Sequence, residues 1–185
     1  MKHLLFIVIS ASLLVGCQQK PKLAQLYQEP QGGNIAKLRV RGFTDNTDIA
    51  QVESCARAHW LGVLRDSDYP ERNPPKVVDR GYKKAAVPDG NAPLDYMEIK
   101  IPADTYIQVR TGFHTSDNQL CALMTPWFKP KPDALYEVRS ELNKEATVCH
   151  IRTWEVNQET GAVTPITGSQ SIVDVLHCKK FPAWQ

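Results

Sequence analysis

Hydrophobic and polar residues alternate along much of the chain, with the period of two that indicates strands with one buried face. Met97, Ile99 and Ile101, for example, alternate with Glu98 and Lys100. Turn-forming residues separate stretches of this kind. The predicted strands span residues 36–43, 97–101, 107–110, 120–124, 135–142, 146–156, 162–167 and 171–177. About eight such strands predict a mainly β fold, a two-sheet antiparallel sandwich.

The first predicted strand has one basic face. Lys37, Arg39 and Arg41 lie on the side opposite to Leu38 and Val40. Because the outer face of a half-buried strand meets water, we expect these three basic side chains to be solvated.

One segment departs from the strand period. Over 48–64 the apolar residues recur at helical intervals, after the possible helix caps Asp45 and Thr47. These apolar residues are Ile49, Val52, Ala56, Trp60 and Val63. The spacing predicts one short helix, which Cys55 would link to the sheet.

A long proline-rich stretch follows the predicted helix. Residues 66–93 hold five prolines among many charged residues, and only Val77-Val78 interrupts them with an apolar pair. Irregular stretches of this length inside a domain are either functional or disordered decoration. The sequence leaves both readings open, and a recognition site on this loop is one of them.

The first seventeen residues have the pattern of an export signal. A basic start at Lys2 precedes an apolar run from Leu4 to Val15, which is too short to span a bilayer as a helix. The run ends in Leu14-Val15-Gly16-Cys17, which resembles the lipobox of bacterial lipoproteins.

The lipobox resemblance implies a lipid anchor. Residues 1–16 would be removed as a signal peptide, and Cys17 would carry the diacylglycerol and the amine-linked acyl chain. Gln18 is not the aspartate that retains lipoproteins of enteric bacteria in the inner membrane, so the resemblance implies the outer membrane. Each buried CH2 of the acyl chains would contribute about 0.8 kcal/mol to membrane affinity.

The rest of the chain is expected to form a tether and one domain. Residues 17–34 are polar and contain prolines and a Gly-Gly pair, so they predict a flexible tether. Residues 35–185 suffice for a single β-sandwich domain. The 22 basic and 20 acidic residues form no concentrated basic run, and no nucleic-acid partner is predicted.

The four cysteines beyond Cys17 predict two disulfides, because their number is even and the envelope is oxidising. Counting does not separate the three possible connectivities. Our hypothesis pairs Cys121 with Cys149 and Cys55 with Cys178. Zinc binding is the competing use of four cysteines, but the chain has no Cys-x-x-Cys pair.

Two short patterns resemble known structures. Asp133-Ala134-Leu135-Tyr136 resembles the start of a tyrosine-corner strand, which implies a sandwich of the immunoglobulin-like or a related kind. The run from Cys121 through Trp127-Phe128-Lys129-Pro130 to Tyr136 and Cys149 resembles small proteobacterial β-sandwich lipoproteins. This second resemblance implies no particular activity.

Trp127 and Phe128 are the candidate interaction surface. An aromatic pair between prolines can be an exposed anchor for a partner. Packing of the same loop over the end of the sandwich is the alternative.

No metal, cofactor or catalytic site is predicted. His150 and His177 would meet only if Cys149 were bonded to Cys178. The loop aspartates that could bind calcium do not follow the twelve-residue calcium-loop pattern; they are Asp45, Asp48, Asp66 and Asp68. Hydrolase motifs such as Gly-x-Ser-x-Gly and His-Glu-x-x-His are absent.

The sequence therefore predicts a lipid-anchored protein of the cell envelope without catalytic activity. Its domain would be a structural or protein-binding module, and the expected partners are the membrane and an envelope protein. The alternative is a lipoprotein that binds a small ligand or a metal. A concave pocket with converging polar groups would favour the alternative.

Overall fold

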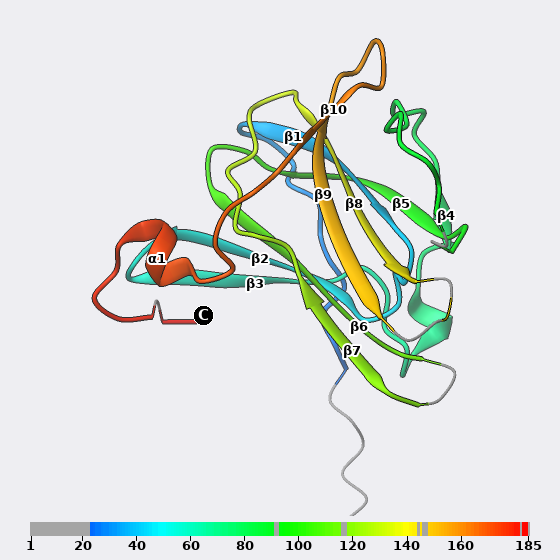
Figure 1. Ribbon diagram of the computed structural model, residues 1–185. Helices are drawn as coiled ribbons and strands as arrows, with labels where there is room; N and C mark the ends of the chain where they lie inside the picture. Colours follow the sequence, from blue (N-terminus) through cyan, green and yellow to red (C-terminus); the bar gives the residue numbers. More distant parts are fainter. Residues whose placement is uncertain are drawn as a thin grey trace, which may run out of the picture.

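The chain forms two β-sheets and one short α-helix in a computed structural model (Figure 1), which confirms the predicted mainly β, two-sheet fold. The predicted signal peptide, the lipobox and Cys17 lie outside the described residues. The structure describes residues 23–90, 93–115, 118–143, 145, 148–181 and 183–184.

The larger sheet has six strands. Across the sheet these are β10 (Val163–Pro165), β9 (Cys149–Val156), β8 (Leu135–Leu142), β1 (Ile35–Arg41), β5 (Tyr96–Pro102) and β4 (Val77–Val78). The pairs β1–β8 and β4–β5 are parallel and the others antiparallel, so this sheet is mixed.

The smaller sheet has four strands, all antiparallel to their neighbours. Across the sheet these are β3 (Arg57–Val63), β2 (Thr47–Ser54), β6 (Tyr106–His114) and β7 (Leu120–Met124). The 3-10 helix η1 (Pro70–Arg72) follows β3. The helix α1 (Ile172–Leu176) lies beside the end of the β2–β3 pair where the two strands are connected (Figure 1).

The facing sides of the two sheets share one hydrophobic core. Leu38 of β1, Ile49 of β2 and Ile107 of β6 are all fully buried in it. Alternation along each strand delivers every second side chain to this core, as the sequence pattern predicts.

The helix predicted over 48–64 is wrong, because this segment forms the hairpin of β2 and β3. The register of the hairpin shifts between Ile49 and Ala50 and again between Val52 and Ser54. A bulge inserts an extra residue into a strand. Both faces of β2 are also buried, since Ile49 lies in the main core and Val52 in the second core cluster. Burial on both faces puts apolar residues three positions apart in sequence, which is the spacing of a helix face.

The strand predicted over 171–177 is also wrong, because α1 forms there. The side chain of Ser171 caps the helix by accepting a hydrogen bond from the backbone N–H of Asp174 at 3.4 Å. His177 ends the helix in the left-handed conformation, with φ at 53°. Capping and the burial of Ile172 in a second core cluster outweigh the strand preference of the β-branched residues here.

Tyr136 makes the contact expected of a tyrosine corner. Its hydroxyl accepts a hydrogen bond at 3.0 Å from the backbone N–H of Lys131, five residues upstream. Burial raises the pKa of the Tyr136 phenol. The bond fixes the loop that enters β8.

Part of the predicted tether belongs to the folded domain. The backbone N–H of Tyr27 donates to the carbonyl oxygen of Val63 at 2.7 Å, and the N–H of Val63 donates to Gln25 at 2.9 Å. These bonds cover the outer edge of β3. The backbone N–H of Ala24 also donates to Asp66, so the folded domain includes residues from Ala24 onward, ahead of the boundary predicted at residue 35.

Both predicted disulfides are present. Cys55, at the tip of the β2–β3 hairpin, is bonded to Cys178 after α1, with the Cα atoms 5.5 Å apart. Cys121 of β7 is bonded to Cys149 of β9, with the Cα atoms 6.2 Å apart, and this bond links one sheet to the other.

Replacing both Cys121 and Cys149 by serine is expected to destabilise the protein by about 2 to 4 kcal/mol, because the unfolded chain loses a cross-link. Urea unfolding of this variant and of the wild type would measure the difference. Peptide mapping without reduction should recover Cys55–Cys178 and Cys121–Cys149 from the wild type. A Cys55–Cys121 peptide would contradict the pairing.

Candidate functional site

The outer face of the six-stranded sheet carries charged side chains on three neighbouring strands. Arg39 of β1 lies between Glu98 of β5 and Glu137 of β8 in the strand register. Two residues further along β1, Arg41 lies directly opposite Arg139 of β8. Residues in register point to the same face, so these five side chains project together.

Four of these side chains form a buried charge network, defined by Arg39, Glu98, Glu137 and Arg139. Arg39 Nε donates to Glu98 at 2.8 Å, and the Arg39 guanidinium lies 3.8 Å from the Glu137 carboxylate. Arg139 donates to Glu137 at 2.7 Å. Glu98 has no solvent exposure and the other three are at most 4% exposed, so the two sheet glutamates are neutralised inside the protein.

Residues 79–90, here the covering loop, bury this network. The backbone N–H of Tyr82 donates to Glu98 at 3.1 Å, and that of Ala85 donates to Glu137 at 3.2 Å. The guanidinium of Arg139 donates to the carbonyl oxygen of Pro88 at 2.6 Å. Most of the covering loop pairs with no strand, and its backbone N–H and carbonyl groups find their hydrogen-bond partners in the buried charged side chains instead.

Two further contacts hold the covering loop in place. At its start, the N–H of Gly81 and the hydroxyl of Tyr96 both donate to Asp79 at 2.8 Å, and these bonds hold the pKa of Asp79 below its usual value. In its middle, the N–H of Ala86 donates to Gly161 in the β9–β10 turn at 2.7 Å.

The expectation that Arg39 and Arg41 are solvated is wrong. They are 4% and 8% exposed, because the covering loop lies over them. The alternating pattern correctly predicted a strand, but the polar face of that strand contacts the covering loop and not water.

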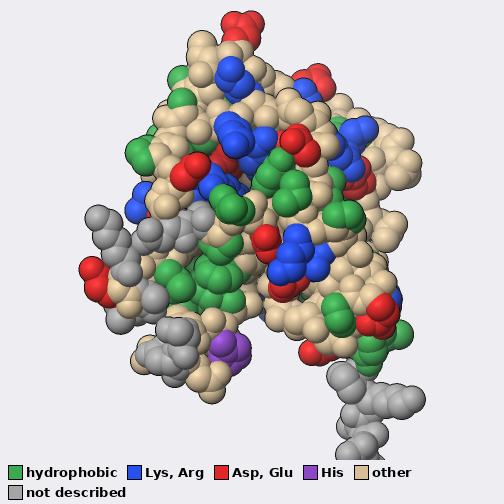
Figure 2. All heavy atoms as spheres, turned by 90° about the vertical axis from the view of Figure 1, so that its right-hand side faces the viewer, with side chains coloured by type: hydrophobic (Ala, Val, Ile, Leu, Met, Phe, Trp, Pro, Cys, Tyr) green, Lys and Arg blue, Asp and Glu red, His purple; other side chains and the backbone are tan. Residues whose placement is uncertain are grey.

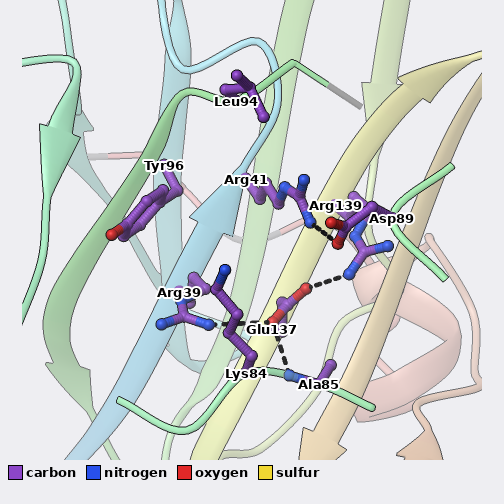
Figure 3. A pocket seen from close by; sticks show the side chains of 9 residues that line it. All are labelled: Arg39, Arg41, Lys84, Ala85, Asp89, Leu94, Tyr96, Glu137 and Arg139. Carbon is purple, nitrogen blue, oxygen red and sulfur yellow. Dashed lines mark hydrogen bonds and ion pairs between the residues drawn. The ribbon is translucent and has the colours of Figure 1, made fainter. Parts of the chain in front are cut away.

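A cavity of about 260 Å³ lies between the covering loop, β1 and β8. In Figure 3 the side chains of Arg39, Arg41, Lys84 and Glu137 point into this space, while the Tyr96 ring points away from it. Figure 2 shows this side of the molecule, where basic, acidic and hydrophobic side chains lie close together. The cavity is lined by Arg39, Arg41, Lys84, Ala85, Asp89, Leu94, Tyr96, Glu137 and Arg139.

Arg41 is bound differently from the charge network. Its buried guanidinium forms an ion pair with Asp89, whose side chain is 67% exposed. The hydrogen bond from Arg41, with smaller contributions from the charges of Arg139 and Lys84, holds the pKa of Asp89 below its usual value. Like charges directly opposite on neighbouring strands repel each other, so the Arg41–Arg139 pair requires an anion beside it.

Two donors at the cavity are unused in the part of the chain that the structure describes. The Lys84 side chain makes no hydrogen bond or ion pair there, although it is exposed at the cavity mouth. The Nε atom of Arg139 is buried without an acceptor. Four cations and three carboxylates surround the cavity once Glu98 is included, so the site can accept a small anion.

A second cavity of about 660 Å³ adjoins the first and shares Arg139 with it. Its wall includes Trp154, whose ring centroid lies 5.4 Å from the Arg139 guanidinium carbon. Val87, Pro88 and Ile166 make much of the remaining lining apolar. A ligand anchored by an anionic group in the first cavity has room for an apolar portion here.

The predicted interaction surface at Trp127 and Phe128 is wrong, because both side chains are only 5% exposed. Trp127 packs with Ile172 of α1 in the second core cluster. The Phe128 ring lies 5.2 Å from that of Tyr136 in the main core. The alternative, in which this loop packs over the sandwich, describes their positions.

The histidines and aspartates considered from sequence have other surroundings. The disulfides pair Cys149 and Cys178 with different partners, which removes the reason to place His150 beside His177. Arg65 donates to Asp45 and Arg110 donates to Asp48, each at 2.7 Å. No group of three metal-ligating side chains occurs among the described residues.

Sequence reasoning missed Glu98, Glu137, Arg139 and Asp89 as site residues. Glu98 alternates with the apolar residues of its strand, and the structure places both Glu98 and Glu137 on the sheet face that points away from the main core. The proline-rich stretch over 66–93 was the available signal, because a loop of that length has to bind to some part of the sheet.

Comparison with protein-family models, with curated proteins and with solved structures finds no match for this chain. Within the described ranges, no helix has the length and apolar character needed to cross a membrane.

Replacing Glu98 by glutamine is expected to destabilise the protein by about 3 to 5 kcal/mol, because Arg39 would keep a buried charge without its nearest counter-ion. For a domain of this size the melting temperature should fall by at least about 6 °C. Glu53→Gln is the matched control, since Glu53 pairs with Arg57 at the exposed hairpin tip. Equal melting temperatures for the two variants would contradict a structural role of the network.

Proposed function

We propose that this chain is a lipid-anchored binding protein of the bacterial cell envelope that holds a small anionic ligand without catalysis. The observation that carries the proposal is the cavity beneath the covering loop, where Arg41, Lys84 and the Nε of Arg139 remain incompletely neutralised. Converging polar groups in a preformed concave site are the usual mark of a ligand pocket.

The cavity favours a small-ligand function over the structural or protein-binding module that the sequence suggested first. The aromatic pair proposed as a protein contact, Trp127 and Phe128, is buried and cannot make one. A cavity of about 260 Å³ is slightly below the usual size of sites for drug-sized ligands, so it suits an anionic group better than a large molecule.

The anchor and location belong to the same proposal. The lipobox supports lipidation at Cys17, and Gln18 supports the outer membrane. Residues 18–23 would then separate the lipid from the domain, to which Ala24 is bound by a hydrogen bond from its backbone N–H to Asp66.

The full chain in detergent is expected to bind inorganic phosphate, sulfate or acetate saturably, with a rise in melting temperature at constant ionic strength. Arg41→Gln should weaken binding at least tenfold, about 1.4 kcal/mol, because the site loses a buried cation. Arg57→Gln removes the same charge from the exposed hairpin tip and should change nothing. If none of the three anions binds saturably to the wild type, the proposed ligand class is wrong.

Labelling with radioactive palmitate in a Gram-negative host tests the anchor. The wild type should carry the label and sediment with the outer membrane, whereas Cys17→Ser should carry none, because the acceptor thiol is absent. Cys55→Ser should retain the label. Incorporation of label into Cys17→Ser would contradict lipidation at this residue.

A further inference from the structure

Asp89 is held to the site by its side chain more than by its backbone. Its neighbours in the covering loop are held by backbone hydrogen bonds, Ala85 to Glu137, Ala86 to Gly161 and Pro88 to Arg139. Among the contacts of the described residues, Asp89 itself is attached through the ion pair with Arg41. Rotation of this exposed side chain would therefore leave the rest of the covering loop in place.

The ion pair of Arg41 with Asp89 is unequal in burial. The side chain of Arg41 is 10% exposed, and it extends from a strand that is paired on both sides. The Asp89 side chain is 67% exposed and pays little to return to water. The cation is thus fixed in the protein, whereas its anion is replaceable.

We propose, on the basis of the anion site proposed above, that Asp89 is a built-in counter-ion that a phosphate or phosphomonoester group displaces from Arg41. The resting protein keeps Arg41 neutralised beside Arg139, and the ligand takes over this role. Asp89 thereby sets the affinity of the site and discriminates against weakly charged anions.

The charge balance selects a dianion. With Asp89 turned away, four cations remain around the cavity and only Glu98 and Glu137 oppose them, which leaves a surplus of two positive charges. A phosphomonoester carries a charge of about −1.5 to −2 at pH 7, whereas a carboxylate carries one. A phosphate group can therefore replace Asp89 and also neutralise Lys84, whereas a carboxylate can only replace Asp89.

The donors around the cavity suit a tetrahedral group. Arg41 provides N–H groups from the sheet and Lys84 provides them from the covering loop, and both side chains line the cavity. Arg139 adds a buried Nε without an acceptor. Charge-assisted bonds from three side chains would hold three phosphate oxygens.

Binding of inorganic phosphate to the full chain in detergent, measured by calorimetry at constant ionic strength, tests the proposal. Asp89→Asn should bind phosphate about five- to tenfold more tightly than the wild type, because the competing carboxylate is removed. Glu53→Gln loses the same charge at the hairpin tip and should bind as the wild type does. The affinity of the wild type for glycerol phosphate should rise between pH 5.5 and 7.5, as the dianion of this phosphomonoester forms with a pKa of about 6.

Acetate and glycerol phosphate complete the experiment. Acetate should bind at least tenfold more weakly than phosphate. Tighter binding of glycerol phosphate than of inorganic phosphate identifies a phosphomonoester as the ligand, and the reverse order identifies free phosphate; both orders support the displacement.

Three results would overturn the inference. Unchanged or weaker phosphate binding by Asp89→Asn, with saturable binding by the wild type, would disprove displacement while the anion site stood. Equal affinities for acetate and phosphate would disprove the dianion preference. Absence of binding by every anion would remove the proposed function itself.

Discussion

Two glutamates and two arginines are buried between the six-stranded sheet and the covering loop, and each charge stays there because of the others. Removing a carboxylate or guanidinium group from water costs several kcal/mol unless partners replace the water. Arg39 supplies a partner to both Glu98 and Glu137, and backbone N–H groups of Tyr82 and Ala85 complete the carboxylates. The covering loop and the charge network are therefore one structural unit.

This unit explains why the cavity exists. A loop packed on an apolar sheet face would follow its side chains closely, whereas long charged side chains hold the covering loop at the distance that their hydrogen bonds set. Glu98, Glu137 and Arg39 have their hydrogen-bond and ion-pair partners within the unit. At its edge, Arg41 and Lys84 carry two positive charges against the single carboxylate of Asp89, and the proposed ligand would bind there.

The strands and disulfides could be predicted because both follow from local pattern and from pairing rules. The sequence around Tyr136 likewise contained the tyrosine corner, since that contact joins residues five positions apart. The hairpin of β2 and β3 could not be predicted, because both faces of β2 are buried, Ile49 in the main core and Val52 in the second core cluster, so its apolar residues do not alternate with polar ones. The helix α1 could not be predicted either, because the β-branched residues over 171–177 favour a strand, whereas the caps at Ser171 and His177 favour a helix.

The candidate site was harder to predict because it depends on what lies outside the sheet. The alternation at Arg39 and Arg41 predicts a polar strand face that points away from the core. Such a face can contact either water or another segment of the chain, and the pattern is the same in both cases. The stretch over 66–93 gave no periodic signal, so its position on the sheet depended on contacts with residues far away in sequence. The position of Trp127 and Phe128 could not be predicted for a similar reason, since the side chains of a loop between prolines can pack against the core or point to solvent.

The backbone at the end of β1 explains why Arg41 needs an anion beside it. Gly42 has a φ of 104°, and a Cβ atom there would collide with the carbonyl oxygen of Ser140. Only glycine lets β1 end so close to β8 and turn toward the smaller sheet. This close approach fixes Arg41 opposite Arg139, and no carboxylate of the neighbouring strands is in register with that pair. The backbone thus places Arg41 beside Arg139, whose own partner is Glu137, and leaves the neutralisation of Arg41 to Asp89 or to the proposed ligand.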